Sequence, residues 1–174
     1  MKLLQIVLIS FFISCQSDQH EISHTEKGSL KQHQLAKLNT DAGIIKIRFL
    51  PKKAPLTVKR IKELINSNFY NGVQFHRVIP NFVAQAGDPT GTGVGGSGQK
   101  IKAEFNDEIH VKGTIAMARL SHDENSADSQ FYIALSTLPH LDKKYTVFAR
   151  VVEGLDVIEK IKKGDQIKSF TLVE

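Results

Sequence analysis

Three short motifs contain residue types that could bind a nucleotide, cleave a bond or hold a metal ion. Residues 91–96 match the G-x-G-x-x-G pattern of dinucleotide sites, but the helical stripe that must follow is absent. Ser121, His122 and Asp123 are the residue types of a hydrolytic triad, whose members meet in space rather than as sequence neighbours. Residues 123–125 lack the glycine turn and distal Glu of a calcium loop. We therefore interpret the first motif as a mobile glycine loop and the others as polar loops.

A longer series of residues resembles a known family. The run 75–89, FHRVIPNFVAQAGDP, resembles the signature of the cyclophilins, which are peptidyl-prolyl cis–trans isomerases. The resemblance continues in the family's order through 91–93, 104–105, 113–118, 128–133, 139–142, 145–148 and 152–157. It covers residues 35–174 and implies an eight-stranded antiparallel barrel capped by two α-helices. It also implies an enzyme that uses no cofactor and no metal.

The chemistry that this resemblance implies breaks no covalent bond. Rotation about an X–Pro bond faces a barrier of about 18–20 kcal/mol, because the amide has partial double-bond character. A donor aimed at the prolyl nitrogen favours the twisted form, in which amide resonance is lost. The resemblance places Arg77 in that role, and its permanently charged, rigid fork suits it. Gln85 would hold the substrate backbone, so Arg77 and Gln85 are the predicted catalytic residues.

The proline ring needs an apolar slot, and the resemblance implies which residues surround it. The strand 116–119, which includes Ala118 and Arg119, would offer backbone hydrogen bonds to an extended peptide. The other predicted substrate-binding residues are Phe82, Val83, Gln130, Tyr132, His140, Leu141 and Tyr145. Tyr132 stands where the family usually has Phe, and His140 replaces a Trp that binds the drug cyclosporin. We therefore expect an active enzyme that cyclosporin inhibits weakly.

The elements that must position these residues are mostly short strands. The sequence pattern predicts strands at 35–40, 43–50, 74–78, 82–86, 114–119, 130–135, 145–152 and 166–173. A helical stripe begins at Pro55, and a second short helix is predicted for 156–163. Many short strands with few helices favour a closed barrel or a sandwich over a parallel sheet.

Composition excludes several other classes of protein. The 174 residues carry a formal net charge of +5, and the basic residues are scattered, so nucleic-acid binding is not predicted. The single cysteine excludes an internal disulfide framework and a cysteine-rich zinc site. No apolar run reaches the ~18 residues of a membrane span. We expect a monomer whose partners are proline-containing unfolded or extended polypeptides.

The first residues are typical of a targeting signal. Residues 1–14 combine Lys2 with an apolar run that is too short to span a membrane, which predicts a signal peptide. Cys15 directly follows, and this junction resembles the lipobox of bacterial lipoproteins, in which the Cys is lipidated after cleavage. Residues 15–34 are polar and predict a flexible tether ahead of an isomerase domain at 35–174. This predicts an exported protein that is lipid-anchored on the periplasmic side of a bacterial membrane.

Two functions remain open on the sequence. The first is a tethered prolyl isomerase that speeds the folding of exported proteins. The second is a non-catalytic module that holds proline-containing segments as a chaperone or scaffold. The presence of both Arg77 and Gln85 favours the enzyme, because a pure binder needs no donor at the prolyl nitrogen.

Overall fold

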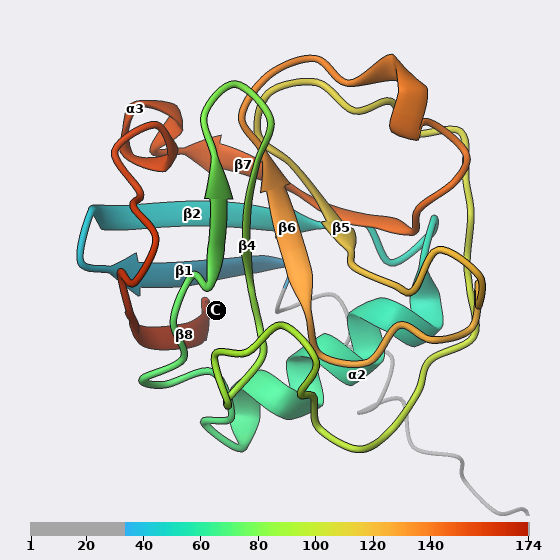
Figure 1. The fold of residues 1–174 in the computed structure, drawn as a ribbon, viewed down its shortest axis with the longest axis horizontal. Helices are drawn as coiled ribbons and strands as arrows, with labels where there is room; N and C mark the ends of the chain where they lie inside the picture. Colours follow the sequence, from blue (N-terminus) through green and yellow to red (C-terminus); the bar gives the residue numbers. More distant parts are fainter. Residues whose placement is uncertain (1–33, 174) are drawn as a thin grey trace, which may run out of the picture.

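The computed structural model describes residues 34–173, and these form a mainly β protein (Figure 1). The strands are β1 (Leu35–Thr40), β2 (Gly43–Phe49), β3 (Arg77–Ile79), β4 (Val83–Ala86), β5 (Thr114–Met117), β6 (Phe131–Ala134), β7 (Val147–Glu153) and β8 (Ile167–Val173). The helices are α2 (Pro55–Asn66), α3 (Leu155–Ile158) and the 3₁₀ helix η1 (Pro139–Leu141). The predicted signal peptide, the lipidation site at Cys15 and nearly all of the predicted tether lie outside the described residues.

All eight strands belong to one antiparallel sheet with the order β3-β4-β6-β5-β7-β2-β1-β8. In Figure 1 the strands β3, β4 and β6 run upright across β1, β2 and β7, so the sheet folds over on itself. Its two ends meet where Gln74 bridges Gln166 and where the N–H of Gly72 donates to the carbonyl of Ile167 at 2.7 Å. The predicted fold class, eight antiparallel strands with two α-helices, is confirmed.

The apolar residues divide between a large core and a smaller cluster. In β2 the alternate residues Ile45, Ile47 and Phe49 are buried in the large core, as the period of two predicts. The α2 stripe of Val58, Ile61, Leu64 and Ile65 packs into the same core. The smaller cluster consists of Val83, Ala116, Tyr132, Ala134, Leu138 and Val147. Partly buried side chains, including those of Phe82, Leu141 and Tyr145, pack on the smaller cluster and form the surface above it.

The second α-helix is shorter than the sequence pattern predicts. The prediction spans 156–163, whereas α3 ends at Ile158. Beyond it the chain turns back toward the start of β3, and the N–H of Gly164, at φ +96°, donates to the carbonyl of Phe75 at 3.0 Å. That pairing helps to join the ends of the sheet. The helical stripe is therefore overridden by a contact with a residue far away in the sequence.

The strand predicted for 114–119 also ends early, at Met117. The N–H of Met117 donates to the carbonyl of Thr146 at 3.0 Å, and the N–H of Ala118 donates to the carbonyl of Gln130 at 2.9 Å. Neither N–H is therefore free to bind an extended peptide. Within residues 34–173, no helix is long and apolar enough to cross a membrane.

Candidate active site

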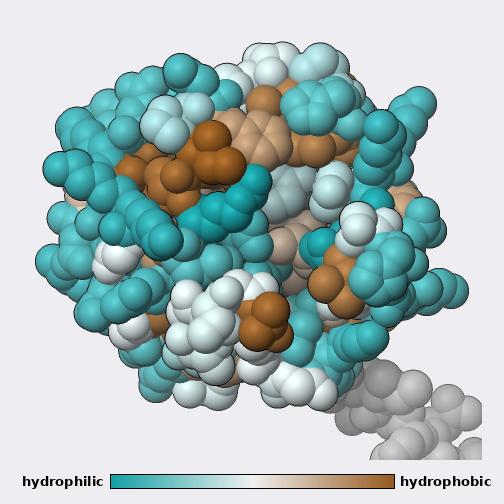
Figure 2. Space-filling view, in the orientation of Figure 1, coloured by the Kyte–Doolittle hydropathy of each residue, from teal (hydrophilic) through white to brown (hydrophobic). Residues whose placement is uncertain are grey.

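Most of the residues that the sequence predicts for the site surround one small pocket of about 200 Å³. Its lining consists of Arg77, Phe82, Val83, Gln85, Ala118, Arg119, Tyr132, Leu141 and Tyr145. These residues come from β3, β4, β6, the segment after β5 and the region around η1. Figure 2 shows that this face of the molecule is hollowed and that apolar side chains gather among polar surroundings. The fold therefore brings together residues that are up to 68 positions apart (77 to 145).

The Arg77 guanidinium lies at the exposed edge of the small pocket. The register of β3 and β4 places Arg77 directly opposite Gln85, and Nη1 of Arg77 donates to Oε1 of Gln85 at 3.3 Å. The guanidinium carbon lies 5.5 Å from the ring centroid of Phe82. Among the ion pairs of residues 34–173, none includes Arg77. Its positive charge is therefore not neutralised by a neighbouring carboxylate.

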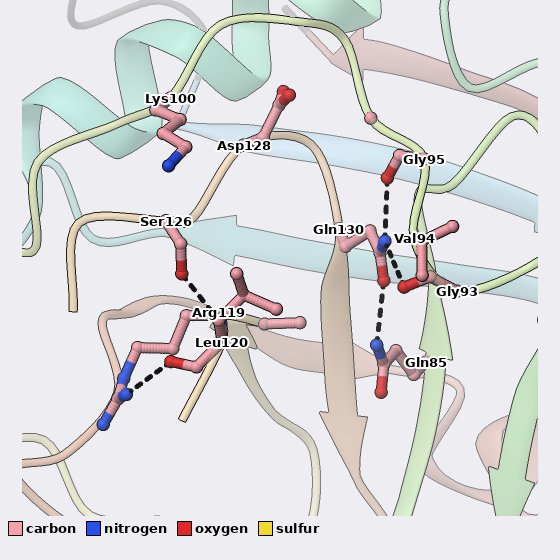
Figure 3. Close-up of a pocket in the computed structure, with 12 residues that line it drawn as sticks. Gln85, Gly93, Val94, Gly95, Lys100, Arg119, Leu120, Ser126, Asp128 and Gln130 are labelled. Carbon is pink, nitrogen blue, oxygen red and sulfur yellow. Dashed lines mark hydrogen bonds between the residues drawn. The ribbon is translucent and has the colours of Figure 1, made fainter. Parts of the chain in front are cut away.

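A chain of amide hydrogen bonds fixes the orientation of Gln85 (Figure 3). The side-chain nitrogen of Gln130 donates to the carbonyls of Gly93 at 3.0 Å and Gly95 at 2.8 Å, so its oxygen faces the other way. That oxygen accepts from Nε2 of Gln85 at 2.9 Å. The Gln85 oxygen then faces Arg77. The glycine loop thus orients the side chain next to the predicted donor.

Aromatic and aliphatic side chains form the apolar wall of the small pocket. Val83 and Tyr132 are buried, whereas Leu141 and Tyr145 are half-buried. The rings of Tyr132 and Tyr145 meet edge to face, with centroids 5.7 Å apart. The apolar character of this wall suits a compact apolar ring. His140 lies outside this lining: it is exposed and stacks on Phe82 at a centroid distance of 5.9 Å.

Arg119 separates the small pocket from a larger neighbour. Its guanidinium carbon lies 4.8 Å from the Tyr145 ring centroid. Its Nε donates to the carbonyl of Lys144 at 3.1 Å, and its Nη1 donates to the carbonyl of Leu120 at 2.8 Å. Arg119 is therefore anchored in place by backbone acceptors as well as by an aromatic face.

The larger neighbour, which we name the glycine-loop pocket, measures about 470 Å³ (Figure 3). Its lining consists of Gln85, Gly93, Val94, Gly95, Gly96, Lys100, Ala118, Arg119, Leu120, Ser126, Asp128 and Gln130. Of these residues, the sequence predicts Gln85, Ala118, Arg119 and Gln130 as site residues but not the others. Their types, mostly Gly and scattered polar residues, resemble those of any surface loop.

The loop that the sequence predicts to be mobile is held by hydrogen bonds. The buried carboxylate of Asp88 accepts from the N–H of Thr90 at 2.7 Å and from the N–H of Gly93 at 2.6 Å. Burial acts to raise the pKa of Asp88, but the hydrogen bonds from Thr90, Gly95 and Gly93 outweigh it and keep that pKa below its usual value. Asp88 and Gln130 thus order the loop from both sides. Among residues 34–173, no three His, Cys, Asp or Glu side chains gather as a metal site.

Residues 35–172 match the model of the cyclophilin type peptidyl-prolyl cis-trans isomerase/CLD family. The chain belongs to the cyclophilin family. A peptidyl-prolyl cis-trans isomerase of Helicobacter pylori is 44% identical over 149 residues, which is 80% of this chain and 90% of the relative. The human peptidyl-prolyl cis-trans isomerase-like 3 is 42% identical over 131 residues, which is 72% of this chain and 80% of the relative.

Solved structures agree with this cyclophilin assignment. A cyclophilin type peptidyl-prolyl cis-trans isomerase of Cryptosporidium parvum, crystallised in the presence of the dipeptide Ala-Pro, superposes with a TM-score of 0.76 at 29% identity. The superposition covers 81% of this chain and 99% of that one. A cyclophilin from Hirschia baltica gives a TM-score of 0.73 at 25% identity and covers 81% and 74% of the two chains.

Proposed function

We propose that this cyclophilin accelerates cis–trans rotation about X–Pro bonds, with the prolyl ring in the small pocket and Arg77 at the prolyl nitrogen. The observation that carries the proposal is an unneutralised guanidinium held beside an apolar pocket by Gln85 and Phe82. Relatives of 42–44% identity are named peptidyl-prolyl isomerases, and a related crystal structure was determined with Ala-Pro. Proline-containing peptide is accordingly the substrate.

The proposed mechanism is selective binding of the twisted amide. Bringing an exchange of tens of seconds to milliseconds takes about 10⁴-fold, or about 5.5 kcal/mol of transition-state stabilisation. A planar amide nitrogen is a poor acceptor, whereas the twisted form offers a lone pair to the Arg77 N–H groups. Gln85 binds the peptide backbone on one side of the bond while the walls hold the prolyl ring. The bond can then turn without any proton transfer.

The competing function is a module that binds proline-containing segments without accelerating their rotation. A protease-coupled assay with a short Ala-Pro peptide and the full-length protein separates the two. We expect a rate that rises linearly with protein concentration and saturates with peptide. Binding of the peptide without any increase in rate would favour the non-catalytic module.

The export context forms a second part of the proposal. Residues 1–14 act as a signal peptide, Cys15 carries lipid, residues 15–34 are a tether, and 35–174 are the isomerase domain. The protein then acts as a monomer on the periplasmic side of a bacterial membrane, where exported chains fold. Support comes from the short apolar run, the small residue before Cys15 and the polar composition of the segment after it.

Membrane fractionation with labelled fatty acid tests this anchoring. We expect the wild-type protein to sediment with membranes and take up label, because three acyl chains exceed the two signals that stable anchoring needs. Cys15→Ala should lose the label and either leave the membrane or remain unprocessed, with peptide turnover unchanged. Ser14→Ala keeps a small residue at the cleavage site and is the matched control. A wild-type protein that is wholly soluble and unlabelled would contradict the anchor.

A further inference from the structure

A buried histidine lies behind the small pocket and takes no part in the mechanism above. His110 is 1% exposed, and its Nε2 lies 2.9 Å from the hydroxyl of Tyr132, a residue of the pocket wall. Its Nδ1 lies 2.9 Å from Oδ1 of Asp142. The imidazole is nearly parallel to the Tyr132 ring, with centroids 6.0 Å apart. The ring therefore connects a wall residue of the pocket to a carboxylate.

The chemistry of the three groups fixes the direction of both hydrogen bonds. A carboxylate accepts only, so Nδ1 of His110 carries the hydrogen and donates to Asp142. Nε2 is then an acceptor, and the Tyr132 hydroxyl donates to it. Burial lowers the pKa of His110 against the opposing effect of Asp142, and burial raises the pKa of Tyr132, which agrees with a neutral imidazole and a protonated phenol. The Tyr132 O–H thus points away from the pocket.

The backbone of His110 is hydrogen-bonded to the residues on both sides of η1. Its N–H donates to Oδ1 of Asp142 at 2.7 Å, and its carbonyl accepts from the N–H of Leu138 at 2.8 Å. Leu138 and Asp142 flank η1, which carries the wall residue Leu141. One residue therefore joins η1 to Tyr132 on β6.

We propose that His110 is a positioning residue of the small pocket. It fixes the position of the Tyr132 ring and the distance between that ring and Leu141, and thereby how well the prolyl ring fits. This inference rests on the proposed function of that pocket. Without the imidazole, the Tyr132 hydroxyl has no acceptor in a buried site and moves toward water in the pocket. The prolyl ring then binds less well. Arg77 and Gln85 are held by separate contacts, so the change falls on KM rather than on kcat.

Two substitutions that differ by one methylene separate this role from a general packing role. In His110→Gln the amide group reaches the position of Nε2 and can accept from Tyr132. In His110→Asn it reaches the position of Nδ1 and keeps the contact with Asp142 instead. We expect His110→Asn in the full-length protein to raise KM for an Ala-Pro peptide about fivefold. His110→Gln should stay within about twofold of wild type, because the hydroxyl keeps a partner.

A double-mutant cycle with Tyr132→Phe tests whether the effect passes through the hydroxyl. In a Tyr132→Phe background no hydroxyl remains to be orphaned, so adding His110→Phe should change KM by less than about twofold. In the wild-type background the same His110→Phe should raise KM at least about fivefold. Equal effects in the two backgrounds would overturn the proposal.

The tautomer gives a readout that is independent of activity and of any variant. Imidazole ¹⁵N shifts of the full-length protein at pH 7 should show His110 protonated at Nδ1 and bare at Nε2. A hydrogen on Nε2 would overturn the assigned direction of the bonds. A wild-type protein that does not accelerate Ala-Pro rotation would overturn the proposed function itself. In an active wild-type enzyme, an unchanged KM in His110→Asn would overturn the positioning role alone.

Discussion

The small pocket and the glycine-loop pocket share Gln85, Ala118 and Arg119, yet they are built in different ways. The small pocket has aromatic and aliphatic walls anchored on strands and η1, and its volume is about 200 Å³. The glycine-loop pocket measures about 470 Å³ and is bounded largely by loop residues, among them three glycines. Strand-borne side chains have a fixed spacing and select one shape, whereas a wider cavity bounded by a loop accepts several.

This difference predicts that the two pockets bind different parts of one peptide. We expect the small pocket to set the chemistry, because a prolyl ring is the compact apolar group that its walls fit. We expect the glycine-loop pocket to receive a neighbouring side chain of the same peptide, since the two cavities share one wall. Substitutions on either side of that wall should then change different properties of the enzyme.

The sharpest test of the small pocket is Arg77→Ala. Removing the guanidinium should lower kcat/KM at least about tenfold, or ~1.4 kcal/mol, for every X–Pro peptide. Arg77→Lys should recover little, because a point charge lacks the planar fork. Arg48→Ala, an exposed arginine on β2, is the matched control and should leave turnover unchanged. Near-normal turnover in Arg77→Ala, measured by the protease-coupled assay, would contradict the assigned mechanism.

Arg119→Ala removes the wall that the two pockets share. The variant loses the bonds to the carbonyls of Lys144 and Leu120 and the contact with the Tyr145 ring. We expect kcat/KM to fall about fivefold, or ~1 kcal/mol, with a change in the preferred residue before proline, because the side chain that lines both pockets is lost. A panel of X-Ala-Pro and Ala-X-Pro peptides measures both effects. An equal loss on every peptide would mean that Arg119 acts on the small pocket alone.

Gly95→Ala disturbs the glycine-loop pocket directly and reaches the small pocket only through the hydrogen bonds that link Gly95, Gln130 and Gln85. A Cβ at Gly95 would clash with Oδ1 of Asp88, so the carboxylate that orders the loop must move. We expect the free energy of unfolding to fall by about 1–3 kcal/mol. Turnover should fall about threefold for peptides that carry a large residue beside Ala-Pro. Val94→Ala is the control, because Val94 lines the same pocket and is 90% exposed. An equal loss of turnover for a peptide without that large residue would contradict the prediction that the two pockets bind different parts of the peptide.

The buried faces of β2 and α2 could be predicted because each element carries a clear periodic pattern of apolar residues. The residues of the small pocket could be named because their motif is contiguous in part, with Arg77 and Gln85 in one run of the sequence. His110 could not be found in this way. Its two partners, Tyr132 and Asp142, lie 22 and 32 residues away, and no local pattern predicts such a pair. The predicted end of α3 is wrong for the same reason, since a backbone contact with a distant residue decides where the helix ends.

The smallest effect that we predict is that of pH between 6 and 8.5. Isomerisation moves no proton, and burial lowers the pKa values of His110 and His76 from their usual value, so both stay neutral at pH 7–8.5. Turnover of a neutral peptide should therefore vary less than about threefold, ~0.65 kcal/mol, between pH 6 and 8.5. A limb of tenfold per pH unit in that range, on a folded protein, would reveal a titrating residue that we have not identified.

Acidification below this range should reveal the titration of His110. Burial lowers the pKa of His110 and outweighs Asp142, which raises it; Arg150 and His140 lower it further. The folded pKa therefore lies below the unfolded value of about 6.5. The unfolded chain then binds the proton first, and stability that is present above pH 6.5 is lost as pH falls toward the folded pKa. The imidazolium would also donate to Tyr132 instead of accepting from it, which raises KM. Urea unfolding and peptide kinetics at pH 8 and pH 5.5 measure both effects. His110→Gln cannot titrate and should show a smaller loss of stability and a smaller rise in KM than wild type; identical profiles would assign the acid sensitivity to other groups.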